Sequence, residues 1–182
     1  GKNFAALCDA LIAQAEAMTR QALSACPDGV GEWADALDND GVGDTPVPLA
    51  VRLEKRGDNL TMDFTGTAAQ TRGPVNAAPA AVLSAALYFM RSLAPDAPNN
   101  AGCLAPLHLV LPAGSLVNPR WPAAVNARTG TVKLACNAII GAWSALAPNG
   151  AAAANAGVAA VIAFAGTDAK GQPFALTEVV AS

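Results

Sequence analysis

Two short segments of strict two-residue alternation constrain the fold of this chain more than any other feature. Leucine, valine, methionine and phenylalanine occupy every second position of residues 49–53 and 60–64, and a short loop with a glycine lies between them. This spacing predicts a β-hairpin in which each strand buries one face. Asp63 is then expected to point away from the face that carries Met62 and Phe64.

Three other segments show the period of a helix. Residues 4–26 carry apolar side chains at intervals of three and four, which is typical of a helix with one buried stripe. A second helix is expected from Asn76, as its cap, to about Leu93, with Pro79 in the first turn. Its apolar arc is wide, which predicts burial on more than one side. A third helix is expected over residues 131–146.

The remaining apolar runs are short and favour strands. Residues 30–38 are expected to be extended, and residues 107–111 to form a short strand. Residues 158–165 suggest a buried strand, which the loop 167–171 joins to a strand over 174–180. The order of elements predicts an α+β (mixed α/β) chain with β-hairpins and three main helices. We expect one domain, with an N-terminal helix (1–26) and a mixed body (27–182).

Charge excludes one class of partner and hints at another. Charged residues make up 14% of the 182 residues, against roughly 25% in an average globular domain. The net charge is −3 and no basic run occurs, so nucleic-acid binding has no electrostatic basis here. Low charge favours faces that pack against other protein, and the alternative is a simple bias towards alanine.

Cysteine spacing and hydropathy narrow the setting. Cys8, Cys26, Cys103 and Cys136 form no CxxC pattern, and the single histidine leaves no zinc set. Buried, reduced thiols and a cytoplasmic location are therefore expected. The segment 150–166 is too rich in alanine and too short to predict a membrane span.

A series of glycine-, proline- and asparagine-containing strings, taken in order, resembles one protein family. The strings are Pro27-Asp28-Gly29, Leu37 to Gly41, Asp63-Phe64-Thr65-Gly66-Thr67, Gln70, Arg72-Gly73-Pro74, Asn76, Asn100 to Pro106, Pro112 to Pro119 and Pro122 to Val125. Together they resemble the hydantoinase B/oxoprolinase family. The resemblance extends over almost the whole chain, and it is specific as an ensemble of strings.

The resemblance implies part of an ATP-dependent hydrolase that opens a lactam or hydantoin ring. It also implies a hydantoinase A-like partner subunit that uses ATP, a divalent metal in the full complex, and a homo- or hetero-oligomer. A ketone carboxylase subunit and a non-catalytic assembly domain are the alternatives. Members of the family are several times longer, so the chain is expected to be a C-terminal-half fragment of a multidomain subunit, inactive alone and without the metal motif.

The candidate site residues each have a structural alternative. Asp63 can accept a proton, or it can cap the turn that follows it. Thr65, Gly66 and Thr67 can bind an oxyanion or phosphate through N–H and hydroxyl groups, or can simply form a turn. Arg72 can hold a carboxylate or phosphate with its planar fork, or form a loop salt bridge.

Three further polar residues complete the set of candidates. Asn76 is a substrate-binding candidate whose alternative is a helix cap. Glu178 matches an acidic position of the family and is a catalytic candidate. His108 has no acidic or cysteine neighbour in sequence, so a surface imidazole is expected.

Overall fold

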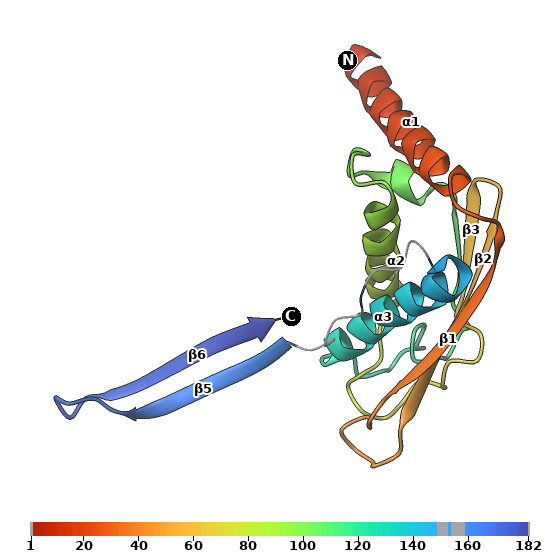
Figure 1. The fold of residues 1–182 in the computed structure, drawn as a ribbon. Coiled ribbons are helices and arrows are strands. Elements are labelled where there is room, and N and C mark those ends of the chain that lie inside the picture. Colours follow the sequence, from red (N-terminus) through yellow and green to blue (C-terminus); the bar gives the residue numbers. More distant parts are fainter. Residues whose placement is uncertain (1, 149–152, 154–158, 182) are drawn as a thin grey trace.

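A four-stranded sheet with helices on one face forms the body of this chain in the computed structural model, which describes residues 2–148, 153 and 159–181 (Figure 1). The strands β1 (Gly29–Leu37), β2 (Val47–Arg56), β3 (Asn59–Asp63) and β4 (Leu107–Val110) lie in that order. The first three are antiparallel neighbours and β4 runs parallel to β3. The expected α+β class is confirmed.

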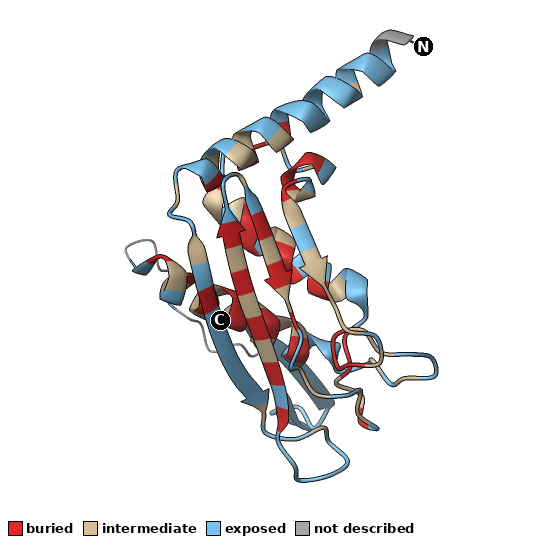
Figure 2. Cartoon of the chain, turned by 90° about the vertical axis from the view of Figure 1, so that its right-hand side faces the viewer, coloured by how far each residue is buried: buried red, intermediate tan, exposed pale blue. Residues whose placement is uncertain are grey.

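The hairpin of β2 and β3 follows the predicted alternation closely. Figure 2 shows buried and less buried residues alternating along β2. Leu53 lies opposite Met62, and both side chains are fully buried. Asp63 lies opposite Arg52 on the other, polar face, as predicted. Each buried leucine or methionine on the apolar face contributes about 1.5–3 kcal/mol relative to exposure.

Helices α2 (Pro79–Leu93) and α3 (Arg128–Leu146) cover the apolar face of the sheet. The Phe89 and Trp143 rings meet edge to face, with 5.2 Å between their centroids, and join the two helices. Helix α3 lies directly on β1, where a Cβ on Gly31 would come within 1.9 Å of the Ala142 carbonyl oxygen. Two glycines of this interface therefore allow backbone contact, since the ring of Trp33 also lies against Gly141.

Helix α1 (Lys2–Ser24) agrees with the prediction in extent but not in burial. Its C-terminal half packs Ala15 and Leu23 into the interior, and contacts the short 3₁₀ helix η1 (Ala101–Leu104) and α2. Its N-terminal half projects beyond the body (Figure 1), where Phe4 is 71% exposed. The predicted stripe is therefore continuous in sequence, but only half of it meets the rest of the described chain.

The start of α2 corrects one prediction. The N-cap of α2 is Ala78 and makes no side-chain cap hydrogen bond, whereas Asn76 lies two residues earlier inside the preceding loop. Pro79 does occupy the first turn, as expected. Burial is also more one-sided than predicted, because Leu83 and Tyr88 are exposed on the outer side of the helix.

The C-terminal strands form a separate hairpin that extends away from the body (Figure 1). Strand β5 (Ala159–Thr167) pairs with β6 (Pro173–Ala181) in antiparallel register, as predicted. The prediction that the first of them is buried is wrong: Val161 and Phe164 are more than half exposed. Apolar sequence indicated burial, but the hairpin has no apolar layer of the described chain against either face.

No helix within the described residues is long and apolar enough to span a bilayer. Most of the segment 150–166, for which a membrane span was considered, lies outside those residues. All four cysteines are free. Cys103 is buried and the others are half-buried, and burial raises the pKa of the Cys136 thiol above its ordinary value.

Candidate functional site

The loop between β3 and α2 carries most of the candidate residues, and it starts with a capped turn. The Asp63 carboxylate accepts a hydrogen bond from the Thr65 backbone N–H at 2.8 Å. Gly66 follows with φ of 96°, a conformation that favours glycine. The contact expected of a turn-capping aspartate is thus present, and it leaves the second carboxylate oxygen available on the polar side of the sheet.

Thr67 fastens the same loop to strand β2. Its hydroxyl donates to the Ala50 carbonyl at 3.0 Å and accepts from the Ala50 N–H at 3.2 Å. One residue later, the Ala68 N–H donates to the Pro48 carbonyl. This hydroxyl is therefore engaged with the backbone of β2, extending the sheet's hydrogen bonding beyond the end of β3.

Asn76 organises the far end of the loop. Its side chain is fully buried; its oxygen accepts from the Thr71 N–H at 2.8 Å. Its amide nitrogen lies at hydrogen-bonding distance from the carbonyls of Thr71, Gly73 and Ala124. An asparagine with its hydrogen-bonding capacity occupied by backbone shapes the loop instead of contacting a ligand directly.

Gln70 joins this loop to the one that precedes α3. Its carbonyl oxygen accepts from the Arg120 N–H at 2.6 Å, and its amide nitrogen donates to the Arg120 carbonyl at 3.3 Å. The Gln70 backbone N–H also donates to the Gly114 carbonyl. The two loops are therefore held side by side by both side-chain and backbone bonds.

Asp40 fixes the turn between β1 and β2 against the same loop. One carboxylate oxygen accepts from the N–H groups of Val42 and Gly43, and the other accepts from Gly73, each at 2.9 Å. These bonds, that from Gly43 first, hold the pKa of the Asp40 carboxyl below its ordinary value of 3.8. A Cβ on Gly73 would lie 1.7 Å from the Asp40 carbonyl oxygen, so only glycine permits this approach.

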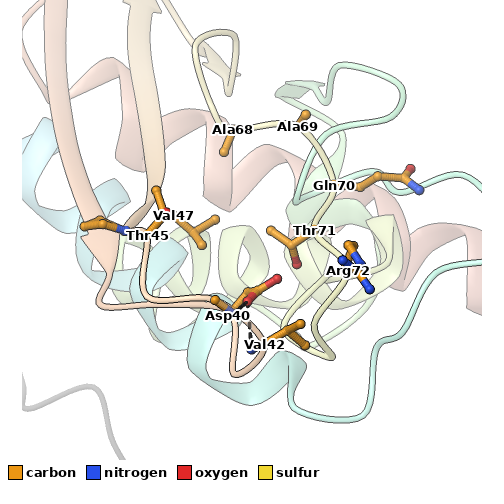
Figure 3. A pocket seen from close by; sticks show the side chains of 11 residues that line it. Asp40, Val42, Thr45, Val47, Ala68, Ala69, Gln70, Thr71 and Arg72 are labelled. Carbon is orange, nitrogen blue, oxygen red and sulfur yellow. Dashed lines mark hydrogen bonds between the residues drawn. The ribbon is translucent and has the colours of Figure 1, made fainter.

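Between the two segments lies a cavity of about 540 Å³, a size typical of small-molecule sites (Figure 3). Its lining combines apolar surface with a few polar groups. The lining residues are Asp40, Val42, Gly43, Thr45, Pro46, Val47, Ala68, Ala69, Gln70, Thr71 and Arg72. The Arg72 side chain is exposed and forms no ion pair or hydrogen bond within the described part of the chain. Its five N–H donors are thus available to an anionic or carbonyl group in this cavity.

The structure brings only some of the predicted site residues together. Arg72 lines the cavity, whereas Thr65 borders a separate depression of about 330 Å³ beside Trp33. Asp63, Gly66 and Thr67 shape the loop next to the cavity without lining it. Glu178 is exposed on β6, in the hairpin that stands apart from these loops (Figure 1).

Two residues of the cavity, Asp40 and Gln70, were absent from the sequence-based candidates. Asp40 lies in the Leu37-to-Gly41 string and Gln70 among the loop strings, so a signal existed for both. Their contacts span 33 and 50 residues of sequence, which no local pattern reveals.

Other candidate chemistry is weakly supported by the described residues. His108 is exposed on β4, as expected for a surface imidazole. Among the residues that the structure describes, no three His, Cys, Asp or Glu side chains gather as a metal site would require. The described residues therefore do not fit the divalent metal that the resemblance implies for the full complex.

Fold and cavity together define an α+β module that presents interlocked loops around a space suited to a small molecule. The chain belongs to the hydantoinase B/oxoprolinase family, whose model matches residues 2–182. It is 30% identical over 168 residues to a protein of Pseudomonas sp. (strain NS671) whose provisional name makes it the B-type component of a D-/L-hydantoinase, covering 86% of this chain and 28% of that one. It is also 42% identical over 80 residues to 5-oxoprolinase of Saccharomyces cerevisiae, over 43% of this chain and 6% of that one.

Two solved structures share the fold. The ATP-dependent caprolactamase of Pseudomonas jessenii superposes with a TM-score of 0.74 and 23% identity, over 98% of this chain and 31% of that one. A nucleotide-free acetone carboxylase gives a TM-score of 0.67 and 17% identity, over 90% of this chain and 24% of that one. The chain thus spans less than a third of the length of these relatives.

Proposed function

We propose that this chain is part of an ATP-dependent enzyme that opens a cyclic amide, either a lactam or a hydantoin. The observation that carries the proposal is family membership over residues 2–182. Similarity to a hydantoinase component and a 5-oxoprolinase, and the shared fold with a caprolactamase, support the cyclic-amide class. A hydantoinase A-like subunit that uses ATP is the proposed partner, and the cytoplasm, where free thiols stay reduced, is the proposed location.

In this proposal the Asp40–Arg72 cavity supplies one wall of the substrate site. Methylene groups of a small ring can lie against Val42, Pro46 and Val47, and the amide edge can face Arg72. The guanidinium can donate to the amide oxygen as negative charge develops there, which stabilises the transition state more than the neutral substrate. Asp40 cannot act as a general acid near neutral pH, because its depressed pKa keeps it ionised.

ATP would supply activation of the amide oxygen from the partner subunit, and no metal-dependent step is assigned to residues of this chain. Asp63 and Glu178 remain candidate catalytic residues, and Thr65, Gly66, Thr67 and Asn76 remain candidates for substrate binding. Their contacts favour a positioning role for Thr67 and Asn76, since backbone groups occupy their polar atoms.

The test uses the intact protein mixed with its hydantoinase A-like subunit and a panel of lactams, hydantoins and ketones. Substrate-stimulated ATP hydrolysis with ring opening is expected for one of the cyclic amides. Arg72→Ala is expected to lower turnover by about two orders of magnitude, the loss typical of one stabilising donor. Arg56→Ala, which removes an exposed arginine outside the cavity, is the matched control. Unchanged turnover in Arg72→Ala would remove the cavity from the mechanism.

A ketone carboxylase subunit is the second candidate, favoured by the shared fold with acetone carboxylase. It predicts ATP hydrolysis that depends on both a ketone and bicarbonate, with a carboxylated product. A non-catalytic assembly domain predicts neither activity. It would instead give a stable, monodisperse oligomer without any ligand.

A further inference from the structure

The arginines of this chain differ sharply in how they are compensated. Arg20, Arg52 and Arg56 form ion pairs with carboxylates. Arg91 donates to backbone carbonyls after the end of α2. The arginines without a carboxylate partner in the described part of the chain are Arg72, Arg120 and Arg128.

These uncompensated arginines belong to loops that are fastened together. On one side of Arg72, the Gln70 side chain bonds both backbone polar groups of Arg120. On its other side, the Pro74 carbonyl accepts from the Ala127 N–H at 2.9 Å, next to Arg128. The three arginines therefore lie around one junction of two loops, although they span 56 positions in sequence.

Arg128 makes the local electrostatics less favourable for the isolated chain. It is the first residue of α3, where the helix dipole is positive, and the first turn contains no acidic residue. The nearest carboxylate on the neighbouring turn, Asp40, already accepts three backbone hydrogen bonds. In a chain of net charge −3, this junction gathers positive charge that the described residues do not balance.

The same junction exposes a large aromatic side chain. Trp121, directly after Arg120, is 93% exposed, more than any other large apolar residue described. Its loop is well fixed: the Asn118 side chain donates to the Leu111 carbonyl at 2.9 Å, and the Gly114 N–H donates to the Asn118 carbonyl at 2.8 Å. A loop held in this way presents the indole with little further loss of conformational freedom on binding.

We infer that Trp121, Arg72, Arg120 and Arg128 form a docking surface for a partner protein, whose matching face has an apolar pocket bordered by carboxylates. Tryptophan and arginine dominate the residues that carry binding energy at protein interfaces. Charge complementarity selects an acidic rim, and it would also speed association at low salt. The inference rests on the proposed function only for the identity of that partner, the hydantoinase A-like subunit. Placed there, the interface would adjoin the Asp40–Arg72 cavity.

The test measures the dissociation constant between the intact protein and its separately purified hydantoinase A-like subunit, at 50 and 200 mM salt. Trp121→Ala is expected to weaken binding at least about tenfold at both salt concentrations. Arg120→Glu/Arg128→Glu is expected to weaken it at least about tenfold at low salt and to flatten the salt dependence. Arg72 is left unchanged, because it also lines the proposed substrate site.

Two controls alter exposed residues elsewhere. Tyr88→Ala removes an aromatic side chain that is 58% exposed on α2, and Lys170→Glu reverses a charge in the β5–β6 turn. Both should bind within twofold of wild type, and all variants should keep the wild-type melting temperature, since the altered side chains are exposed. If wild type binds and the Trp121 and double arginine variants bind equally well, the docking surface is wrong. If wild type does not bind at all, the proposed partnership fails, and the docking inference fails with it.

Discussion

At the scale of single residues, Asp40 connects two loops through three backbone hydrogen bonds. Its pKa is lowered in the folded state, so its stabilising effect is complete above the ordinary value of 3.8 and disappears as the pH falls through the lowered pKa. Asp40→Ala should therefore lower the melting temperature at pH 7, and the difference from wild type should shrink below pH 3.8. Thermal unfolding across pH checks this.

Asp38→Ala is the matched control for that measurement, since Asp38 is exposed on the same turn and makes no side-chain hydrogen bond among the described residues. It should melt close to wild type throughout. Equal melting temperatures for the two variants at pH 7 would show that the Asp40–Gly73 contact contributes nothing to stability.

Asn76 illustrates a buried amide whose removal leaves several backbone groups without partners. Asn76→Ala should reduce the free energy of unfolding by about 3 kcal/mol, because buried unsatisfied groups cost about 1–3 kcal/mol each and the loop partly relaxes. Urea unfolding of the chain measures the loss. Asn99→Ala, at an exposed position, should leave the unfolding midpoint unchanged, and a similar loss in both variants would contradict the role given to Asn76.

At the scale of elements, the β1–α3 contact depends on the absence of a side chain at Gly31. Gly31→Ala places a methyl group 1.9 Å from the Ala142 carbonyl oxygen, so β1 and α3 must separate. We expect a loss of about 3 kcal/mol in the free energy of unfolding, the upper range for overpacking. Gly43→Ala, with no atom within 4 Å of the added Cβ, should change it by less than about 0.5 kcal/mol. Equal stability of the two variants would refute this account.

The elements themselves were largely predictable, because alternation and helical spacing are local signals. The β2–β3 hairpin and helices α1, α2 and α3 appear close to their expected bounds. Loop contacts were not predictable: Gln70 meets Arg120, and Asp40 meets Gly73, through pairings set by the whole fold. The cap of α2 failed for a related reason, because Asn76 bonds the loop and Ala124 in place of the helix.

At the scale of the whole molecule, apolar sequence and burial part company at both projecting elements. Phe4 and Leu7 on α1, and Phe164 and Leu176 on the β5–β6 hairpin, are all exposed by more than 50%. Local patterns show that a face is apolar, but they do not show what covers it. The low charge content agrees with such faces meeting other protein.

A two-stranded hairpin without a packing layer is only marginally stable in water. In the isolated chain, amides of β5 and β6 should therefore exchange with solvent much faster than those of β2 and β3. Hydrogen exchange read by mass spectrometry distinguishes these peptides. In the intact protein the same hairpin should become protected if its apolar side chains are covered. Equal protection of both hairpins in the isolated chain would show that β5–β6 is stable unaided.

The parallel pairing of β3 with β4 also has a consequence for how the chain folds. The β1–β2–β3 meander can form from neighbouring segments, but β4 joins only after the 43 residues between Asp63 and Leu107, including α2, have been laid across the sheet. Closing so long a connection costs entropy before any contact repays it. We therefore expect the meander to form early during synthesis on the ribosome, with the edge of β3 open until α2 docks. That interval is when a nascent chain of this kind would most need a chaperone.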